Sequence, residues 1–422
     1  MNGRTLANLL LTPGARRYIE TAADDLVEHK SIVCLLPEVV DADEVWQSLL
    51  REIWHRDPYF DIREIDLSKP VPLDPTDALC HELGRAEDIA SCGDLDQISR
   101  VEPRPDIVYL KGYDKVPEAS RRSWVGLLSA WVDISKRMAD GGVRPTALCL
   151  VAPADEALEE VQTDVLLTRH RWWGFPSILE TRIALRQMTT PDLSPFSSIW
   201  KEHLVPAIAG PDPCFLSLLW EECELEKGFV SRSCAEYARS RGWATEQLER
   251  WHARDFLRRP RTARAEHLPS DGRRLWAAGV LQFTPERGVD VHTAALEVMG
   301  LRAQVLHRIW RGQAEFLLPT LELIRLRICE DFVRRYGRDW PLGWLAPETE
   351  EEEDQVGENP LACSWGYLYA VLKSHVGSLV DHDLVSFAHR AKAVRNALAH
   401  GGLVSRQPAE TLWNEAASRG LL

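Results

Sequence analysis

Three short apolar runs in the first half of the chain restrict its fold more than any other feature. The runs are SIVCLLP (31–37), PDIVYLKG (105–112) and TALCLVAP (146–153). Patterns typical of helices separate them, the first over 41–56 with Asp41 near its start. Short buried strands that alternate with helices are typical of a mostly parallel sheet covered by helices. We therefore expect an α/β domain over residues 1–190.

Length and composition limit the class of protein. A chain of 422 residues exceeds one core of usual size, so several domains are expected. The formal net charge of −14 argues against broad affinity for nucleic acid, although a small local RNA site stays open. No apolar run approaches the roughly 20 residues that span a bilayer. Nine scattered cysteines without a C-x-x-C pair indicate reduced thiols. We expect a cytoplasmic protein with no membrane contact, metal or cofactor.

The second half of the chain is dominated by helical patterns. Residues 191–300 are expected to be helical, with a winged-helix-like stretch over RRLWAAGVLQFTPERGVDVH (273–292). Its Arg273, Arg274 and Arg287 would either contact nucleic acid or a partner, or form a solvated basic face. Residues 301–422 should form an all-α bundle, because long amphipathic patterns follow one another there.

Three further segments have specific expectations. A long helix after residue 301 should kink before Pro319, since proline removes a helical hydrogen bond. The acidic stretch 346–360 should be a solvated loop, because like charges repel. The segment 257–272 should be an exposed linker. In RWWGFPS, Trp172 and Trp173 would either bind a ligand or partner, or pack in the core.

Near the C-terminus, the stretch VRNALAHGG places Arg395 five residues before His400. The spacing R-x-x-x-x-H occurs three times in the chain, also as Arg287/His292 and Arg302/His307. Only the third has an Asn directly after the Arg, Asn396, and a Gly-Gly stop after the His. The same residues would also suit an ordinary helix end, since cations favour a helix C-terminus and glycine favours its last turn.

This stretch resembles the signature of the HEPN superfamily, whose R-x(4–6)-H motif lies on a late helix of a helical domain. The resemblance covers about residues 310–415. It implies a metal-independent ribonuclease in which two protomers form the site, with Arg395 and His400 catalytic and Asn396 the polar neighbour that orients them. The chemistry fits, because histidine moves protons near neutral pH and arginine has a fork of donors suited to phosphate oxygens.

The order of strands and helices in the first 190 residues resembles a P-loop NTPase of the AAA or STAND kind. Such modules carry G-x-x-x-x-G-K-[ST] after the first strand. Here EVVDADEVW follows that strand, with neither glycine nor lysine, and Lys111 and Gly112 follow the strand DIVYL where a magnesium-binding acid should stand. The resemblance implies a degenerate module that no longer hydrolyses nucleotide. A generic α/β domain is the alternative.

Together these features suggest an α+β multidomain protein with two possible functions. The first is a HEPN-type endoribonuclease that leaves 2′,3′-cyclic phosphate ends. It would be regulated by an N-terminal sensor or partner-binding module, would act as a homodimer on RNA, and would belong in the toxin or phage-defence setting that the resemblance implies. The second is a non-catalytic regulator or scaffold, with a dead ATPase-like module and a bundle used only for dimerisation.

Overall fold

A computed structural model describes residues 3–68, 74–83, 104–188, 193–222, 225–257, 264 and 267–422. The chain forms two compact units, each assembled from separate stretches. Unit 1 comprises Met1–Met188, Gly210–Leu218 and Trp243–Ala295, and unit 2 comprises Thr189–Ala209, Leu219–Gly242 and Leu296–Leu422. Residues 191–300, expected as a region of their own, are thus divided between the two units.

Unit 1 is built on a parallel sheet of five strands in the order β2-β3-β4-β1-β5. The strands are β1 (Ser31–Leu36), β2 (Ile62–Asp66), β3 (Ile107–Lys111), β4 (Ala147–Pro153) and β5 (Leu167–Arg171). The three apolar runs form β1, β3 and β4 at the centre, which confirms the predicted α/β fold. Every residue of β1 is buried, as expected for a parallel strand covered on both faces.

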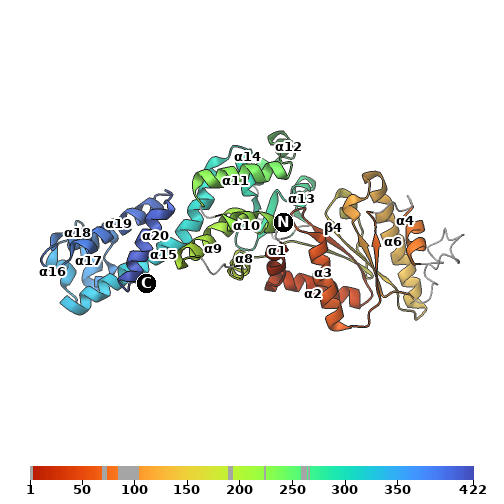
Figure 1. Cartoon of the computed structure of the whole chain (residues 1–422), viewed down its shortest axis with the longest axis horizontal. Helices are drawn as coiled ribbons and strands as arrows, with labels where there is room; N and C mark the ends of the chain where they lie inside the picture. Colours follow the sequence, from red (N-terminus) through yellow and green to blue (C-terminus); the bar gives the residue numbers. More distant parts are fainter. Residues whose placement is uncertain are drawn as a thin grey trace. The chain divides into compact units, whose positions relative to one another are not determined.

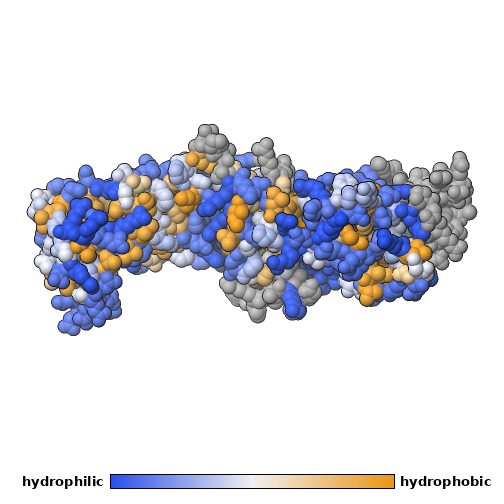
Figure 2. Space-filling view, turned by 90° about the horizontal axis from the view of Figure 1, so that it is seen from below, coloured by the Kyte–Doolittle hydropathy of each residue, from blue (hydrophilic) through white to orange (hydrophobic). Residues whose placement is uncertain are grey.

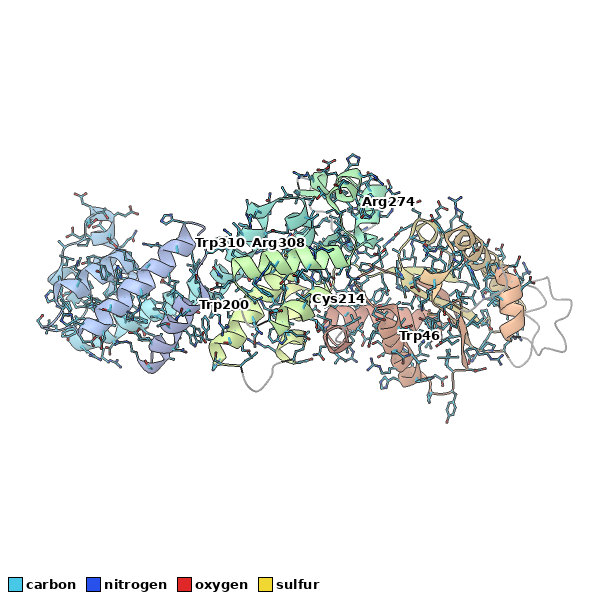
Figure 3. All side chains as sticks on the ribbon, turned by 45° about the horizontal axis from the view of Figure 1, so that its top comes forward. Trp46, Trp200, Cys214, Arg274, Arg308 and Trp310 are labelled. Atoms are coloured by element: carbon cyan, nitrogen blue, oxygen red, sulfur yellow. The ribbon has the colours of Figure 1, made fainter. Side chains whose placement is uncertain are left out.

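Helices cover both faces of this sheet (Figure 1). On one face α2 (Pro13–Val27) packs beside α3 (Ala42–Arg56), and α6 (Glu118–Asp140) lies on the other with α4 (Pro75–Leu83). Trp46 of α3, labelled in Figure 3, stacks on Tyr109 of β3 with ring centroids 3.9 Å apart. The expected helix 41–56 is therefore confirmed, and an aromatic pair anchors it to the sheet.

The two edge strands escaped sequence analysis because their side chains are largely polar. On β5, Thr168 donates to Asp25 of α2 at 2.8 Å, and His170 Nε2 lies 2.9 Å from the same carboxylate. Lys30 Nζ lies 3.0 Å from the other carboxylate oxygen of Asp25. The edge of the sheet is thus fixed by a half-buried polar cluster, which leaves no apolar run in the sequence.

A second, antiparallel element completes unit 1. Helix α13 (Ser270–Ala277) leads into the hairpin of β6 (Leu281–Thr284) and β7 (Gly288–Val291). This helix and hairpin occupy the stretch 273–292, which was predicted to be winged-helix-like. The remaining elements are α1 (Gly3–Leu10), α7 (Glu156–Glu159), α8 (Ile178–Arg186), α12 (Thr245–Arg250), and the 3₁₀ turns Tyr113–Lys115 and Ala253–Leu257. Half of the expected linker 257–272 lies outside the described residues, and its end, from Ser270, belongs to α13.

Unit 2 is helical throughout its described part. Its elements are α9 (Pro195–Ala209), α11 (Lys227–Ser240), α15 (Arg302–Tyr336), α16 (Trp340–Trp344), α17 (Glu350–Glu358), the 3₁₀ turn Pro360–Ala362, α18 (Trp365–Ser374), α19 (His382–Ala399) and α20 (Arg406–Ser418). Two further helices, α10 (Pro213–Glu221) and α14 (Thr293–Val298), cross the boundary between the units. Helix α15 continues through the exposed Pro319 and packs along α9.

The acidic stretch 346–360, predicted to be a loop, contains helix α17, so that prediction was wrong. Thr349 caps the helix by accepting a hydrogen bond from the Glu352 N–H at 3.2 Å. Four glutamates occupy the first turn, where negative charge interacts favourably with the helix dipole. Val356 is buried and attaches the helix to the unit. The favourable interaction of these four glutamates with the helix dipole therefore outweighs the repulsion between them.

On the face seen in Figure 2, apolar residues are scattered among hydrophilic ones and do not form one broad patch. No helix in the described ranges is both long and apolar enough to span a bilayer.

Packing between α9 and α15 depends on Gly312, because a Cβ there would lie 3.0 Å from Ala207 Cβ and 3.0 Å from Leu204 Cα. We expect Gly312→Ala to destabilise unit 2 by about 1–3 kcal/mol through overpacking. Urea unfolding followed by tryptophan fluorescence measures this. Gly357→Ala in α17 is the matched control, since its nearest neighbour is at an ordinary 3.7 Å. An equal effect of both substitutions would contradict the packing argument.

The cluster on β5 predicts a pH dependence. Burial lowers the pKa of His170, and the negative charge of Asp25 only partly opposes it. The unfolded chain, with its histidine near pKa 6.5, therefore takes up a proton before the folded one does. The stability of unit 1 should fall as pH decreases below about 6.5. Urea titrations between pH 8 and 5 should show a smaller pH dependence for His170→Gln. Replacement of the exposed His55 by glutamine should leave the pH dependence of stability unchanged.

Candidate functional site

The carboxyl edge of the sheet in unit 1 is where a parallel α/β fold usually binds ligands. After β1 the chain turns at once into α3, and the Glu38 N–H donates to the carbonyl of Ala277 at 2.8 Å. The N-terminus of α3 is capped by Asp41, whose carboxylate accepts from the N–H groups of Asp43 at 2.9 Å and Glu44 at 3.3 Å. The donors that would hold a phosphate are therefore occupied by the chain's own carboxylate.

The neighbouring strand ends are also occupied. Lys111 at the end of β3 pairs with Glu64 at 3.1 Å. Beyond β4, Asp155 accepts from the Leu158 N–H at 2.8 Å and from Arg121 Nη1 at 3.2 Å. Arg121 also donates to the carbonyl of Asp114 at 2.9 Å. The acidic groups at this edge serve as helix caps and ion-pair partners, in agreement with the missing P-loop signature.

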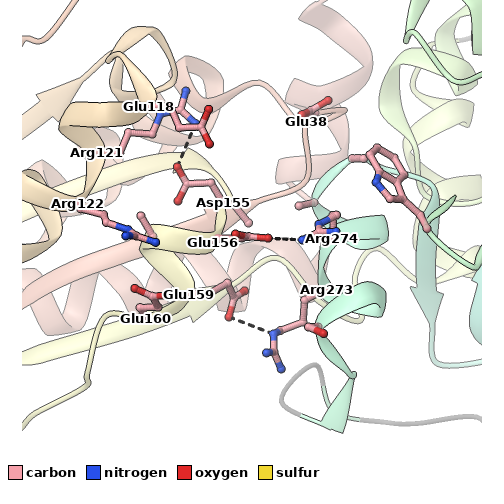
Figure 4. A pocket seen from close by; sticks show the side chains of 16 residues that line it. Glu38, Glu118, Arg121, Arg122, Asp155, Glu156, Glu159, Glu160, Arg273 and Arg274 are labelled. Carbon is pink, nitrogen blue, oxygen red and sulfur yellow. Dashed lines mark hydrogen bonds and ion pairs between the residues drawn. The ribbon is translucent and has the colours of Figure 1, made fainter. Parts of the chain in front are cut away.

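A pocket of about 520 Å³ opens beside these strand ends (Figure 4). Its lining contains six carboxylates, from Glu38, Glu118, Asp155, Glu156, Glu159 and Glu160, and four guanidinium groups, from Arg121, Arg122, Arg273 and Arg274. Six negative against four positive groups give the wall a net negative charge, which disfavours phosphates. In the described part of the chain, no group of histidine, cysteine and acidic side chains is arranged to hold a metal ion.

The three arginines singled out in 273–292 do not form a solvated basic face. Figure 4 shows Arg274 paired with Glu156 of α7, and Arg273 Nε lies 3.8 Å from Glu159. Arg273 also donates to the carbonyl of Leu268 at 2.8 Å. Arg287 is buried, with 7% of its surface exposed. These side chains are engaged within unit 1.

The paired tryptophans of RWWGFPS pack within unit 1. Trp172 is 5% exposed and contacts the rings of Tyr18 and Phe175, with centroids 5.3 and 4.7 Å away. Trp173 stacks on Phe283 of β6 at 4.9 Å. Their aromatic surface is therefore largely used for packing against the chain's own rings.

In unit 2, the stretch VRNALAHGG forms the end of α19. The helix ends at Ala399, and Gly401, with φ of +75°, reverses the chain. The Gly402 N–H donates to the Ala397 carbonyl at 2.7 Å, and the Gly401 N–H donates to the Leu398 carbonyl at 3.1 Å. A Cβ at Gly402 would lie 2.9 Å from the Ala397 oxygen. The two glycines are thus required by the turn itself, which is a Schellman motif.

Helix α15 holds this turn in place. Trp310 Nε1, labelled in Figure 3, donates to the carbonyl of Leu398 at 2.7 Å. Gln313, only 2% exposed, donates to the Val404 carbonyl at 2.7 Å and accepts from the Val404 N–H at 2.9 Å. Sequence analysis did not identify Trp310 or Gln313. The only sequence signal was Gln313, a polar residue among the mostly apolar buried positions of α15.

The three motif residues lie at the outer surface of this fixed turn. Arg395 and His400 are exposed, Asn396 is half-buried, and Arg395 Nη1 donates to Asn396 Oδ1 at 3.1 Å. Within the described ranges neither Arg395 nor His400 forms a salt bridge. The pKa of Glu322 is lowered chiefly by its hydrogen bonds from Arg325 and more weakly by the charge of Arg395. The exposed guanidinium and imidazole therefore lie on one end of one helix.

The other two arginine–histidine matches have different environments. His292 is fully buried, and its Nε2 lies 3.3 Å from Asp212, which caps α10 by accepting from the Phe215 N–H at 3.1 Å. His307, on α15, is exposed and its ring lies 5.2 Å from that of Trp310. The buried pair is structural, because no solvent reaches it.

Comparisons with known proteins give little further information. No family model and no curated protein matches the sequence. Among solved structures, one similar chain is from "Structure of Drosophila ORC bound to GC-rich DNA and Cdc6", with 15% identity and a TM-score of 0.32, over 96% of this chain and 69% of that one. Another is from "Structure of Drosophila ORC bound to DNA", with 14% identity and a TM-score of 0.31, over 96% and 71%. This similarity is too low to carry a functional inference.

The charged wall of the pocket makes a prediction about stability. Glu159 contacts Arg171 at 2.5 Å, and the two side chains are 14% and 9% exposed. Glu156 pairs with Arg274 on the surface, where they are 77% and 48% exposed. Glu159→Gln should destabilise the protein by about 3 kcal/mol, because it removes the negative charge that faces the largely buried guanidinium of Arg171. Glu156→Gln on the same helix should cost less than about 1 kcal/mol. Equal shifts in the urea midpoint would contradict this.

Proposed function

We propose that unit 2 is a metal-independent endoribonuclease of the HEPN type. The observation that carries the proposal is the end of α19, where Arg395 and His400 are exposed on a turn held by Trp310 and Gln313. A guanidinium and an imidazole can support transesterification at a ribose. His400 accepts the proton of the 2′-OH as its oxygen attacks the phosphorus, and Arg395 stabilises the charge on the phosphorane. The P–O5′ bond then breaks, the 5′-oxygen takes up a proton from the protonated His400 or from water, and the other product carries a 2′,3′-cyclic phosphate.

The position of the helix end favours this assignment. On a helix the two side chains point about 140° apart, so one copy alone does not focus both on one phosphate. The helix ends at Ala399, and His400 is the residue that caps it, with φ of −97° and ψ of 15°. Asn396 accepts from Arg395 and restricts the guanidinium. A second copy of the chain, meeting the first at the exposed Ala399, would complete the pocket in the proposed homodimer.

For unit 1 we propose a regulatory role without nucleotide hydrolysis. The self-capped N-terminus of α3 and the net negative charge of the pocket support this part of the proposal. The same features favour the second candidate function, a non-catalytic regulator or scaffold, because they would be retained in a protein that only binds partners. A role in a toxin or phage-defence system is part of the ribonuclease proposal only.

The ribonuclease proposal predicts the effect of removing the imidazole. His400→Ala should reduce RNA cleavage in EDTA at least about 100-fold, the usual contribution of a general base. The assay uses purified full-length protein, labelled RNA and detection of cyclic phosphate ends. His382→Ala, at the exposed opposite end of α19, is the matched control and should cleave like the wild type. Cleavage that persists in His400→Ala, or a wild-type protein that leaves RNA intact, would overturn the proposal and favour the scaffold.

A further inference from the structure

A group of cations surrounds Tyr369 on the surface of unit 2. Lys392 Nζ of α19 lies 5.2 Å from the centre of the tyrosine ring, and Lys373 Nζ of α18 lies 6.0 Å from it. The imidazole of His389 is 5.2 Å from the same ring, centroid to centroid. Lys373 and His389 are exposed, and Tyr369 and Lys392 are half-buried. We refer to these four residues as the Tyr369 cluster.

The cluster has no counter-charge in the described part of the chain. Neither lysine forms a salt bridge there, whereas Arg390, which neighbours His389, pairs with Glu415 on α20. The tyrosine ring can attract both ammonium groups through its negative face, but it carries no net charge to neutralise them. A bound anion would neutralise them.

Two residues of the Tyr369 cluster, His389 and Lys392, lie on the same helix as the proposed ribonuclease site. His389, Lys392 and Asn396 are spaced three and four residues apart and therefore share one face of α19. Lys392 precedes His400 by eight residues, or about 12 Å along the helix axis. A strand of RNA with its cleaved phosphate at His400 could place a phosphate a few nucleotides away on the two lysines.

We infer that the Tyr369 cluster binds the phosphate backbone of single-stranded RNA beside the cleavage site. The inference rests on the proposed function for its choice of ligand. A lysine ammonium group binds phosphate oxygens as a point charge and does not distinguish one base from another. The cluster therefore adds affinity for RNA and fixes the position of the strand, without preference for a base sequence. Tyr369, whose ring lies within 6.0 Å of both ammonium groups, is a positioning residue.

The test uses full-length wild-type protein and a fluorescent 2′-O-methyl oligoribonucleotide, which cannot be cleaved through its 2′-OH. The double variant Lys373→Gln/Lys392→Gln should weaken binding at least about tenfold at low salt. It should also reduce the slope of log K against log salt by about 1.4, or about 0.7 for each lost phosphate contact. Tyr369→Leu should weaken binding while leaving the slope unchanged, because it removes no charge.

Arg390→Gln is the control for loss of a positive charge, since it removes one from α19 at a position already paired. It should leave affinity and slope at wild-type values. Unchanged RNA binding by the lysine double variant would overturn the inference. So would competition by poly-glutamate but not by RNA, which would identify a protein-docking surface. Binding through the lysines without any cleavage would remove the ribonuclease proposal and leave this inference standing.

Discussion

The need to satisfy the polar groups at the ends of helices shapes both candidate sites in this chain. At the carboxyl edge of the sheet, Asp41 caps α3 and Asp155 caps α7, so carboxylates occupy the backbone donors that a phosphate would require. At the end of α19 the carbonyls are satisfied by the backbone of Gly401 and Gly402 alone. Capping by carboxylates closes the carboxyl edge of the sheet to anions. Capping by backbone groups leaves the side chains at the end of α19 available to bind a ligand.

This contrast separates the charged groups of unit 1 from those near the end of α19. In unit 1 the arginines near the pocket are held by acids, as Arg121 is by Asp155 and Arg171 by Glu159. In unit 2, Lys392 and Arg395 of α19 form no salt bridge within the described residues. The capacity to bind an anion therefore depends on which arginines and lysines are already neutralised, and not on how many the chain contains.

The proposed ribonuclease and the Tyr369 cluster depend on the same scaffold. Trp310 and Gln313 of α15 fix the turn that follows α19, and α18 places Tyr369 beside His389 and Lys392. Because buried hydrogen bonds position these elements, the exposed groups can be held in a fixed arrangement without being buried themselves. A site on a rigid helix end gives more precise positioning than one on a flexible loop.

The sequence by itself determined the central strands and the helix that follows Asp41, because local hydrophobic periodicity predicts them. The Arg395–His400 motif, found by residue spacing, stays a prediction. The sequence could not reveal β2 and β5, whose polar side chains are stabilised by partners such as Asp25 that are distant in the chain. It also misjudged 346–360, where Thr349 and the helix dipole outweigh charge repulsion. Only the tertiary structure decided which cations are neutralised, because an ion pair between residues such as Arg274 and Glu156 depends on folding and not on sequence separation.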